Sequence, residues 1–150
     1  MKKFSLITNL ISILMIIGVV VFLVCIWKNI PEVVPIHFNA AGIADSFDKK
    51  SSLFIEIVIM TVSFLLLAVL ERFPKLWNYP VEVTTENRKR LYKSTLYMLG
   101  LLKIIIMGMC IIGVLSSVYA GFPIWIMYIL IGFMFAIIIA GTVACFVKKN

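Results

Sequence analysis

The sequence is too apolar for a soluble globular domain. Its 150 residues are 63% hydrophobic and only 14% charged, with a net charge of +7, and the mean hydropathy is +1.11. In soluble domains roughly a quarter of all residues are charged. The composition therefore excludes a soluble domain and indicates an integral membrane protein.

Four segments are long and apolar enough to cross a bilayer as helices. A spanning helix needs about 20 predominantly apolar residues, and residues 4–27, 53–70, 99–119 and 124–147 qualify. The first segment is longer than the apolar core of a signal peptide and lacks a small-residue cleavage site, so we expect it to remain as an anchor. The predicted fold is an all-α integral membrane protein with a single four-span domain over residues 1–150.

Basic residues predict the orientation of the spans, because Lys and Arg are retained on the cytoplasmic side. Ten of them flank the spans at the N-terminus, in residues 71–98 and at the C-terminus, where Lys148 and Lys149 lie. Residues 28–52 carry only Lys28, Lys49 and Lys50. We therefore expect a plasma-membrane protein with both termini in the cytoplasm and residues 28–52 as an outer loop.

The cytoplasmic stretch, residues 71–98, begins irregularly at Pro74 and Pro80 and then has a helical pattern that Thr84 or Thr85 can cap. We expect a helical extension of the third span. Its basic residues suit either anionic lipid headgroups or a cytoplasmic partner, and they are Arg88, Lys89, Arg90 and Lys93. Nucleic-acid binding is not expected, since orientation accounts for most of the charge and no recognition motif is present.

Lys103 lies one turn inside the third span, near enough to the inner surface for its side chain to reach headgroups. We interpret it as an anchor in preference to an ion ligand. No other basic residue falls within a span, and no acidic residue is expected at mid-depth, so the sequence does not favour an ion-coupled transporter.

Small residues at four-residue spacing predict how the last two spans pack, since backbones in lipid approach closely at such positions. The short connection at residues 120–123 makes these spans an antiparallel hairpin, so we expect the two stripes to meet, in preference to forming a dimer face. The stripes are Gly113, Ser117 and Gly121 in span three and Gly132, Ala136, Ala140 and Ala144 in span four.

The outer loop has the pattern of a folded cap. Pro31 and Pro35 favour extended backbone, residues 36–38 alternate like a short strand, and residues 39–42 suit a turn with Gly42 at positive φ. We expect its apolar side chains to pack on the helix ends, and these are Ile36, Phe38, Ile43 and Phe47.

The only histidine of the chain, His37, lies in this loop. It forms a conceivable metal-ligand set with Asn39, Asp45 and Asp48, but a single histidine without ordered ligand spacing is weak evidence for a metal. We expect His37 to hold the loop by hydrogen bonds, and we assign no metal, cofactor or catalytic residue.

The segment IPEVVPIHFNAAGIADSFDKKS resembles the Pro-x-x-Pro-x-His-Phe-Asn-x-x-Gly-x-x-Asp pattern of a bacterial membrane family of unknown function. That family forms the N-terminal half of SdpI-type immunity proteins, which protect producing cells from a sporulation-delaying toxin. A second segment, NRKRLYKSTLYMLGLLK, is similar to the family at Asn87, Arg88, Tyr92 and Lys103. The resemblance implies a multi-spanning protein of a Gram-positive plasma membrane, although this chain lacks the second multi-spanning half.

Three functions are consistent with these features. In the first, the protein is an immunity or sensing module that contacts a secreted peptide toxin on its outer loop and couples to a cytoplasmic regulator. The expected recognition residues are Pro35, His37, Phe38, Asn39, Gly42, Asp45 and Lys50, and the coupling or lipid-contact residues are Asn87, Arg88, Arg90, Tyr92 and Lys93. In the second, it is an accessory subunit that packs on a larger membrane transporter through span four. The third, a membrane metalloenzyme, requires a metal.

Overall fold

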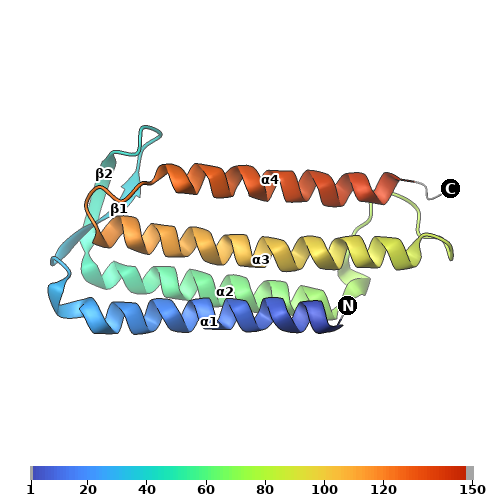
Figure 1. The fold of residues 1–150 in the computed structure, drawn as a ribbon, viewed down its shortest axis with the longest axis horizontal. Coiled ribbons are helices and arrows are strands. Elements are labelled where there is room, and N and C mark those ends of the chain that lie inside the picture. Colours follow the sequence, from blue (N-terminus) through green and yellow to red (C-terminus); the bar gives the residue numbers. More distant parts are fainter. Residues whose placement is uncertain (1, 148–150) are drawn as a thin grey trace.

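Four long helices run side by side and carry a small β-hairpin at one end (Figure 1). The structure is a computed structural model and describes residues 2–147. The helices are α1 (Lys2–Ile26), α2 (Leu53–Arg72), α3 (Arg88–Val118) and α4 (Trp125–Phe146), and each is long and apolar enough to cross a membrane. The predicted all-α membrane fold with four spans is therefore confirmed, and the protein is a multi-pass membrane protein.

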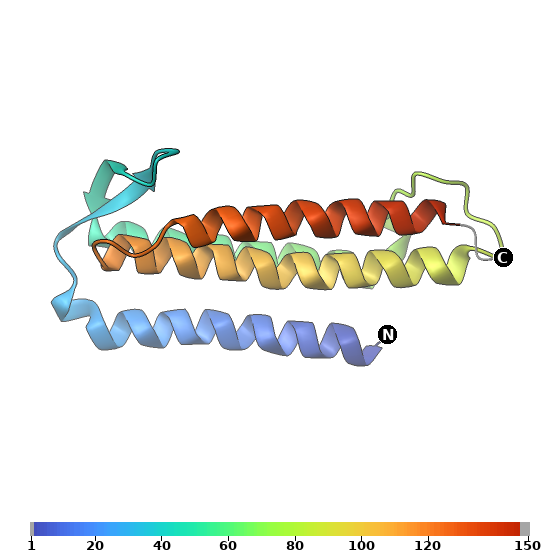
Figure 2. The ribbon, with the colours of Figure 1, turned by 45° about the horizontal axis from the view of Figure 1, so that its top comes forward.

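The helix α3 is the centre of the bundle. It packs against each of the other three helices, whereas α4 packs chiefly against α3. Figure 2 shows α3 between α1 and α4. The main core consists of apolar side chains from α1, α2 and α3, the most deeply buried being Leu23, Met60, Met107 and Val114. The helix α4 contributes no side chain to this core, so most of its surface is left to lipid.

We call the two ends of the bundle the hairpin end and the terminal end. At the terminal end α1 starts, α2 ends, α3 starts and α4 ends (Figure 1). A short helical turn, η3 (Pro74–Leu76), and an irregular stretch join α2 to α3 there. Lys148 and Lys149, which support the predicted orientation, lie outside the described residues.

The first turns of α3 extend beyond the start of α1 (Figure 1), so the predicted helical extension of the third span is present. The helix starts later than the expected cap at Thr84 or Thr85. Thr84 and Asn87 instead close a turn on each other, with the Thr84 amide donating to Asn87 Oδ1 at 2.8 Å and the Asn87 amide to Thr84 Oγ1 at 3.3 Å. Asn87 occupies the N-cap position.

The hairpin is more extensive than the sequence predicted. Strands β1 (Val33–Phe38) and β2 (Ala44–Lys49) pair antiparallel, with Pro35 opposite Phe47 and an irregular register around His37. The turn is closed by Asn39, whose Oδ1 accepts hydrogen bonds from the amides of Ala41 and Ile43 at 2.9 and 3.1 Å. The short helical turns η1 (Trp27–Asn29) and η2 (Lys50–Ser52) connect the hairpin to α1 and α2.

The hairpin docks on the bundle through residues other than those predicted. Ile30 and Val34 are the buried side chains, and the Tyr128 hydroxyl of α4 donates to the carbonyls of Asn39 and Ala40 at 3.3 and 3.2 Å. Ile36, Ile43 and Phe47 were expected to pack on the helix ends but are exposed. The prediction was wrong for these three because the helix ends are already covered by the residues at the base of the hairpin.

The predicted contact between two small-residue stripes is also wrong. Gly132 and Ala136 are exposed, and a Cβ at Gly132 would meet nothing within 4 Å. Ala140 lies at the edge of the α3–α4 contact, where it lines a cavity together with Tyr97 and Met98 of α3. Gly141 is the α4 glycine at the interface, where a Cβ would lie 2.7 Å from Met98 Sδ. On α3, Gly113 faces the Glu56 carboxylate of α2. On the same helix, Gly108 faces Leu130 of α4, and at Gly100 a Cβ would lie 2.6 Å from the Phe4 ring of α1, so glycines occur at the helix contacts but not as two facing stripes.

The other residues of the two predicted stripes lie in different environments. Gly121 lies in the α3–α4 turn at φ +79°, and Ser117 is half-buried on α3. Ala144 is half-buried, and its carbonyl accepts a hydrogen bond from Arg90. We refer to Gly132 and Ala136 below as the free α4 stripe.

Candidate functional site

The hairpin exposes a set of large apolar side chains that the rest of the molecule does not cover. We call this set the hairpin surface, and its members with their exposed fractions are Val33 (58%), Ile36 (47%), Ile43 (64%) and Phe47 (59%). Val33, Ile36 and Phe47 project from the two strands, and Ile43 lies in the turn between them. In this two-stranded sheet β2 pairs only with β1. Every residue of β2 after Ala44 is exposed, so this strand offers both apolar side chains and an unpaired edge.

Polar residues of the hairpin fall into two groups. His37 Nδ1 donates to Asp45 Oδ1 across the strands at 2.5 Å, and both side chains are exposed beside the hairpin surface. Lys50 is held in place instead, by an ion pair with Glu32 at 2.9 Å and by the Trp27 ring 5.2 Å away. Within residues 2–147, no three metal-ligating side chains lie close enough together to bind a metal ion.

The predicted recognition residues therefore do not form a single surface. His37 and Asp45 are exposed and accessible to a ligand. Pro35, Phe38 and Asn39 are half-buried, and Gly42, at φ +77°, lies against Ile124. These positions and Lys50 maintain the hairpin. The four apolar residues of the hairpin surface, all of them exposed, are better candidates for contact with a ligand.

A buried polar group that the sequence did not predict lies towards the terminal end. The Lys103 side chain is completely buried, with Nζ donating to Glu71 Oε1 at 2.7 Å and to Asn9 Oδ1. The Ser5 hydroxyl donates to the other Glu71 oxygen, and the Phe64 ring centroid lies 5.9 Å from Nζ. We call Ser5, Asn9, Glu71 and Lys103 the polar node. It joins α1, α2 and α3 at one point.

The interpretation of Lys103 as an anchor reaching headgroups is thus wrong. A charged group within a span faces a partner in the bundle when one is available, because lipid solvates it poorly. Glu71 is the partner and is itself buried, although the sequence placed it at the start of the cytoplasmic stretch. The sequence does carry a signal for this pair: a carboxylate directly follows span two, near the depth at which span three carries its only cation.

The basic residues at the start of α3 have separate functions. Arg90 donates to the carbonyls of Ala144 at 2.8 Å and Cys145 at 3.2 Å and also to that of Val147, so it caps the C-terminus of α4 and is not free for lipid or a partner. Lys93 lies over the Tyr97 ring at 5.6 Å. Asn87 holds the preceding turn by donating to the Glu82 carbonyl at 2.8 Å.

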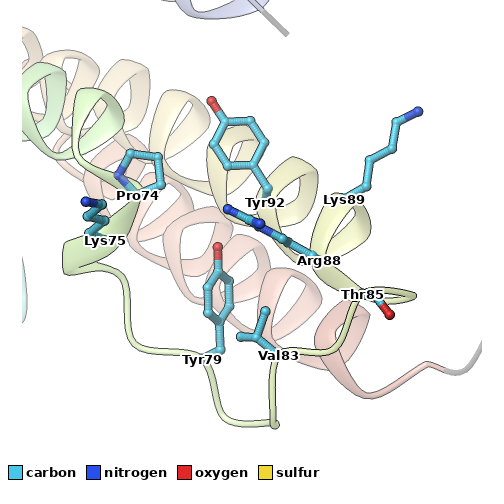
Figure 3. A pocket seen from close by; sticks show the side chains of 8 residues that line it. All are labelled: Pro74, Lys75, Tyr79, Val83, Thr85, Arg88, Lys89 and Tyr92. Atoms are coloured by element: carbon cyan, nitrogen blue, oxygen red, sulfur yellow. The ribbon is translucent and has the colours of Figure 1, made fainter.

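Arg88 and Tyr92 line a cavity of about 560 Å³ between α3 and the irregular stretch before it. Figure 3 shows the Arg88 side chain passing between Tyr79 and Tyr92 towards Lys75. The Tyr92 ring stacks on Trp77 with centroids 5.2 Å apart, which fixes one wall. Burial raises the pKa of Tyr79 above its ordinary value. Its hydroxyl, which is protonated at neutral pH in any case, can donate a hydrogen bond.

Comparison with known proteins identifies one similarity. Residues 13–61 match the family model described as "Domain of unknown function (DUF1648)". The match covers about a third of the chain: most of α1, the whole hairpin and the first part of α2. No curated protein and no solved structure matches the chain significantly.

Proposed function

We propose that the protein is a sensing or immunity module of the plasma membrane that recognises a secreted antimicrobial peptide or toxin on its hairpin. The observation that carries the proposal is the hairpin surface: four large apolar side chains exposed on an ordered two-stranded sheet with a free edge. An extended peptide can add a strand to such an edge and place its side chains against apolar neighbours.

The charge distribution supports an outward-facing hairpin. The described residues at the hairpin end include Lys28, Lys49 and Lys50, whereas the terminal end carries Lys2, Lys3 and the six basic residues from Arg72 to Lys93. The positive-inside rule then places the terminal end in the cytoplasm. A peptide arriving from outside would meet the hairpin first.

The polar node offers a route from the hairpin to the cytoplasm. Helices α1 and α2 flank the hairpin directly, and both bond to Lys103 of α3 through Asn9 and Glu71. A peptide that changes the spacing of α1 and α2 would alter these bonds and shift α3, whose first turns extend past the start of α1. In this proposal, a cytoplasmic regulator responds to that shift.

The test is the survival of a sensitive strain that expresses the protein and is challenged with secreted membrane-active peptides. We expect protection by the wild type and its loss with Phe47→Ser or His37→Ala. Each variant removes a ring that the bound peptide would cover, and the loss of one such contact weakens binding about tenfold or more. Ala120→Ser, an exposed change in the α3–α4 turn at the same end, should retain protection. Asn39→Ala is unsuitable because Asn39 closes the turn.

Equal protection by the wild type and by Phe47→Ser, at equal membrane expression, would remove the hairpin surface from the mechanism. No protection against any peptide by a correctly inserted protein would contradict the immunity function as a whole.

The free α4 stripe favours a second candidate, an accessory subunit of a larger membrane complex. Small residues at four-residue spacing permit close helix approach in lipid, and within residues 2–147 Gly132 and Ala136 are exposed and not covered by another helix. Co-purification of a stoichiometric membrane partner, lost with Ala136→Leu and retained with Thr142→Leu on another side of α4, would support this function. Retention of the partner by both variants would contradict it.

A further inference from the structure

Two cavities adjoin at the terminal end of the bundle. The first, of about 560 Å³, is the one lined by Arg88 and Tyr79 (Figure 3). The second, of about 620 Å³, lies between the inner parts of α1, α2 and α3. Pro74 and Tyr92 line both. The two cavities therefore adjoin at these two residues, and together we call them the terminal groove.

Several basic side chains and a single carboxylate line the terminal groove. The basic side chains that line it are Lys2, Arg72, Lys75, Arg88 and Lys89. None of them forms an ion pair with a described residue, since the three ion pairs found involve other basic groups. The only carboxylate in the lining is Glu71, which is already bound to Lys103 at 2.7 Å. The groove thus has an uncompensated positive charge.

The remaining lining is apolar and reaches into the membrane-spanning part of the bundle. Leu6 of α1, Ala68 of α2 and Leu96 of α3 line the second cavity, and the Tyr79 and Tyr92 rings line the first. A soluble phosphate compound would leave the apolar part unused. A lipid would use both parts, with a phosphate beside the cations and acyl chains along the apolar walls.

We infer that the terminal groove binds an anionic phospholipid of the adjacent leaflet through its phosphate-bearing headgroup. Arg88 is the central ligand because its planar guanidinium projects into the groove between two tyrosines and suits bidentate contact with phosphate. Lys75 and Lys89 supply further charge at the rim, and the Tyr79 hydroxyl supplies a donor. This inference does not depend on peptide recognition at the other end of the molecule.

Trp77 provides a local reporter, because it stacks on Tyr92 and the other tryptophans, Trp27 and Trp125, lie at the hairpin end. The experiment uses the full chain with Trp27→Phe and Trp125→Phe in nanodiscs of phosphatidylcholine. Quenching of Trp77 is compared between a small fraction of brominated phosphatidylglycerol and the same fraction of brominated phosphatidylcholine. We expect stronger quenching by the anionic lipid.

Variants separate a defined site from diffuse surface charge. Arg88→Gln and Lys75→Gln should each lower the preference for phosphatidylglycerol about fivefold, the factor that corresponds to about 1 kcal/mol per cation near a membrane surface. Lys93→Gln is the matched control, because it removes one charge from the same helix outside the groove. Its preference should stay close to that of the parent protein.

Equal quenching by the two lipids would overturn the inference, and so would an equal loss of preference in Lys93→Gln and Arg88→Gln. A further arm adds soluble glycerol phosphate. If glycerol phosphate shifts the Trp77 fluorescence in the absence of anionic lipid, and quenching shows no lipid preference, the groove binds a soluble phosphate compound and the lipid assignment is wrong.

Discussion

At the residue scale, Lys103 is the group whose burial has the largest energetic consequence. Its ammonium is inaccessible and is compensated by one carboxylate, one amide oxygen and an aromatic ring. Removing one partner of a buried pair leaves the other charge without compensation, whereas replacing both by apolar groups is often tolerated. The polar node therefore makes the helices interdependent.

Lys103→Met should destabilise the bundle by about 3 kcal/mol, because Glu71 is left buried without its cation. The double variant Lys103→Met with Glu71→Leu should recover much of that loss. Unfolding in mixed micelles of increasing SDS content measures both. A loss no larger than that of Lys93→Met, which alters an exposed lysine of the same helix, would show that the node is not a buried ion pair.

Gly42 is the residue that allows the hairpin turn to rest on α4. It has φ +77°, and an added Cβ would lie 2.5 Å from Ile124 Cγ2. Gly42→Ala should loosen the hairpin by about 1–2 kcal/mol from the positive φ alone, and more from the clash. Gly121→Ala is the control, since it has φ +79° but open space around it.

Limited proteolysis of the segment around residues 40–45 compares these two variants. Faster cleavage in Gly42→Ala than in Gly121→Ala is expected. Equal cleavage rates would show that the contact with Ile124 does not hold the hairpin.

At the element scale, α4 is attached to the bundle by one face and by its C-terminus. Gly141 meets Met98 on that face, whereas Gly132 faces outwards. Gly141→Ala should therefore destabilise the α3–α4 pair, and Gly132→Ala should be neutral or stabilising by up to about 1 kcal/mol through helix propensity. The same SDS titration measures the two changes. The opposite order would support the packing predicted from the sequence.

The C-terminus of α4 depends on Arg90 of α3. A guanidinium carries only hydrogen-bond donors. Here it donates to the carbonyls of Ala144, Cys145 and Val147 at the C-terminus of α4. Arg90→Gln should increase amide hydrogen exchange in the last turn of α4, about residues 141–147, while Lys89→Gln should not. Equal exchange in both variants, measured by mass spectrometry, would contradict the capping function.

At the scale of the whole molecule, the sequence predicted the spans but not the faces through which they pack. Length and hydropathy suffice for spans, because lipid imposes them. In lipid, the faces towards protein and towards acyl chains are equally apolar, so spans such as α4 carry no periodic signal for orientation. The free α4 stripe and the packed Gly141 lie on one helix and look alike in the sequence.

The folded loop was predicted from the sequence, but which of its side chains are exposed was not. Pro35, Asn39 and Gly42 indicated a folded loop, and the hairpin is present. Which of its apolar side chains remain exposed depends on how Ile30 and Val34 cover the helix ends, and that is a tertiary property. The polar node was missed for a similar reason, since the partners of Lys103 come from two other helices.

The most direct test of the central claim, that the hairpin binds a peptide outside the cell, is photocrosslinking at Phe47. A benzophenone amino acid at this position is compared with one at Phe133 of α4, because the two side chains are equally exposed at 59% and 58%. In cells challenged with secreted peptides, we expect a peptide adduct at position 47 and none at position 133. No adduct at position 47, or the same adducts at both positions, would contradict recognition by the hairpin.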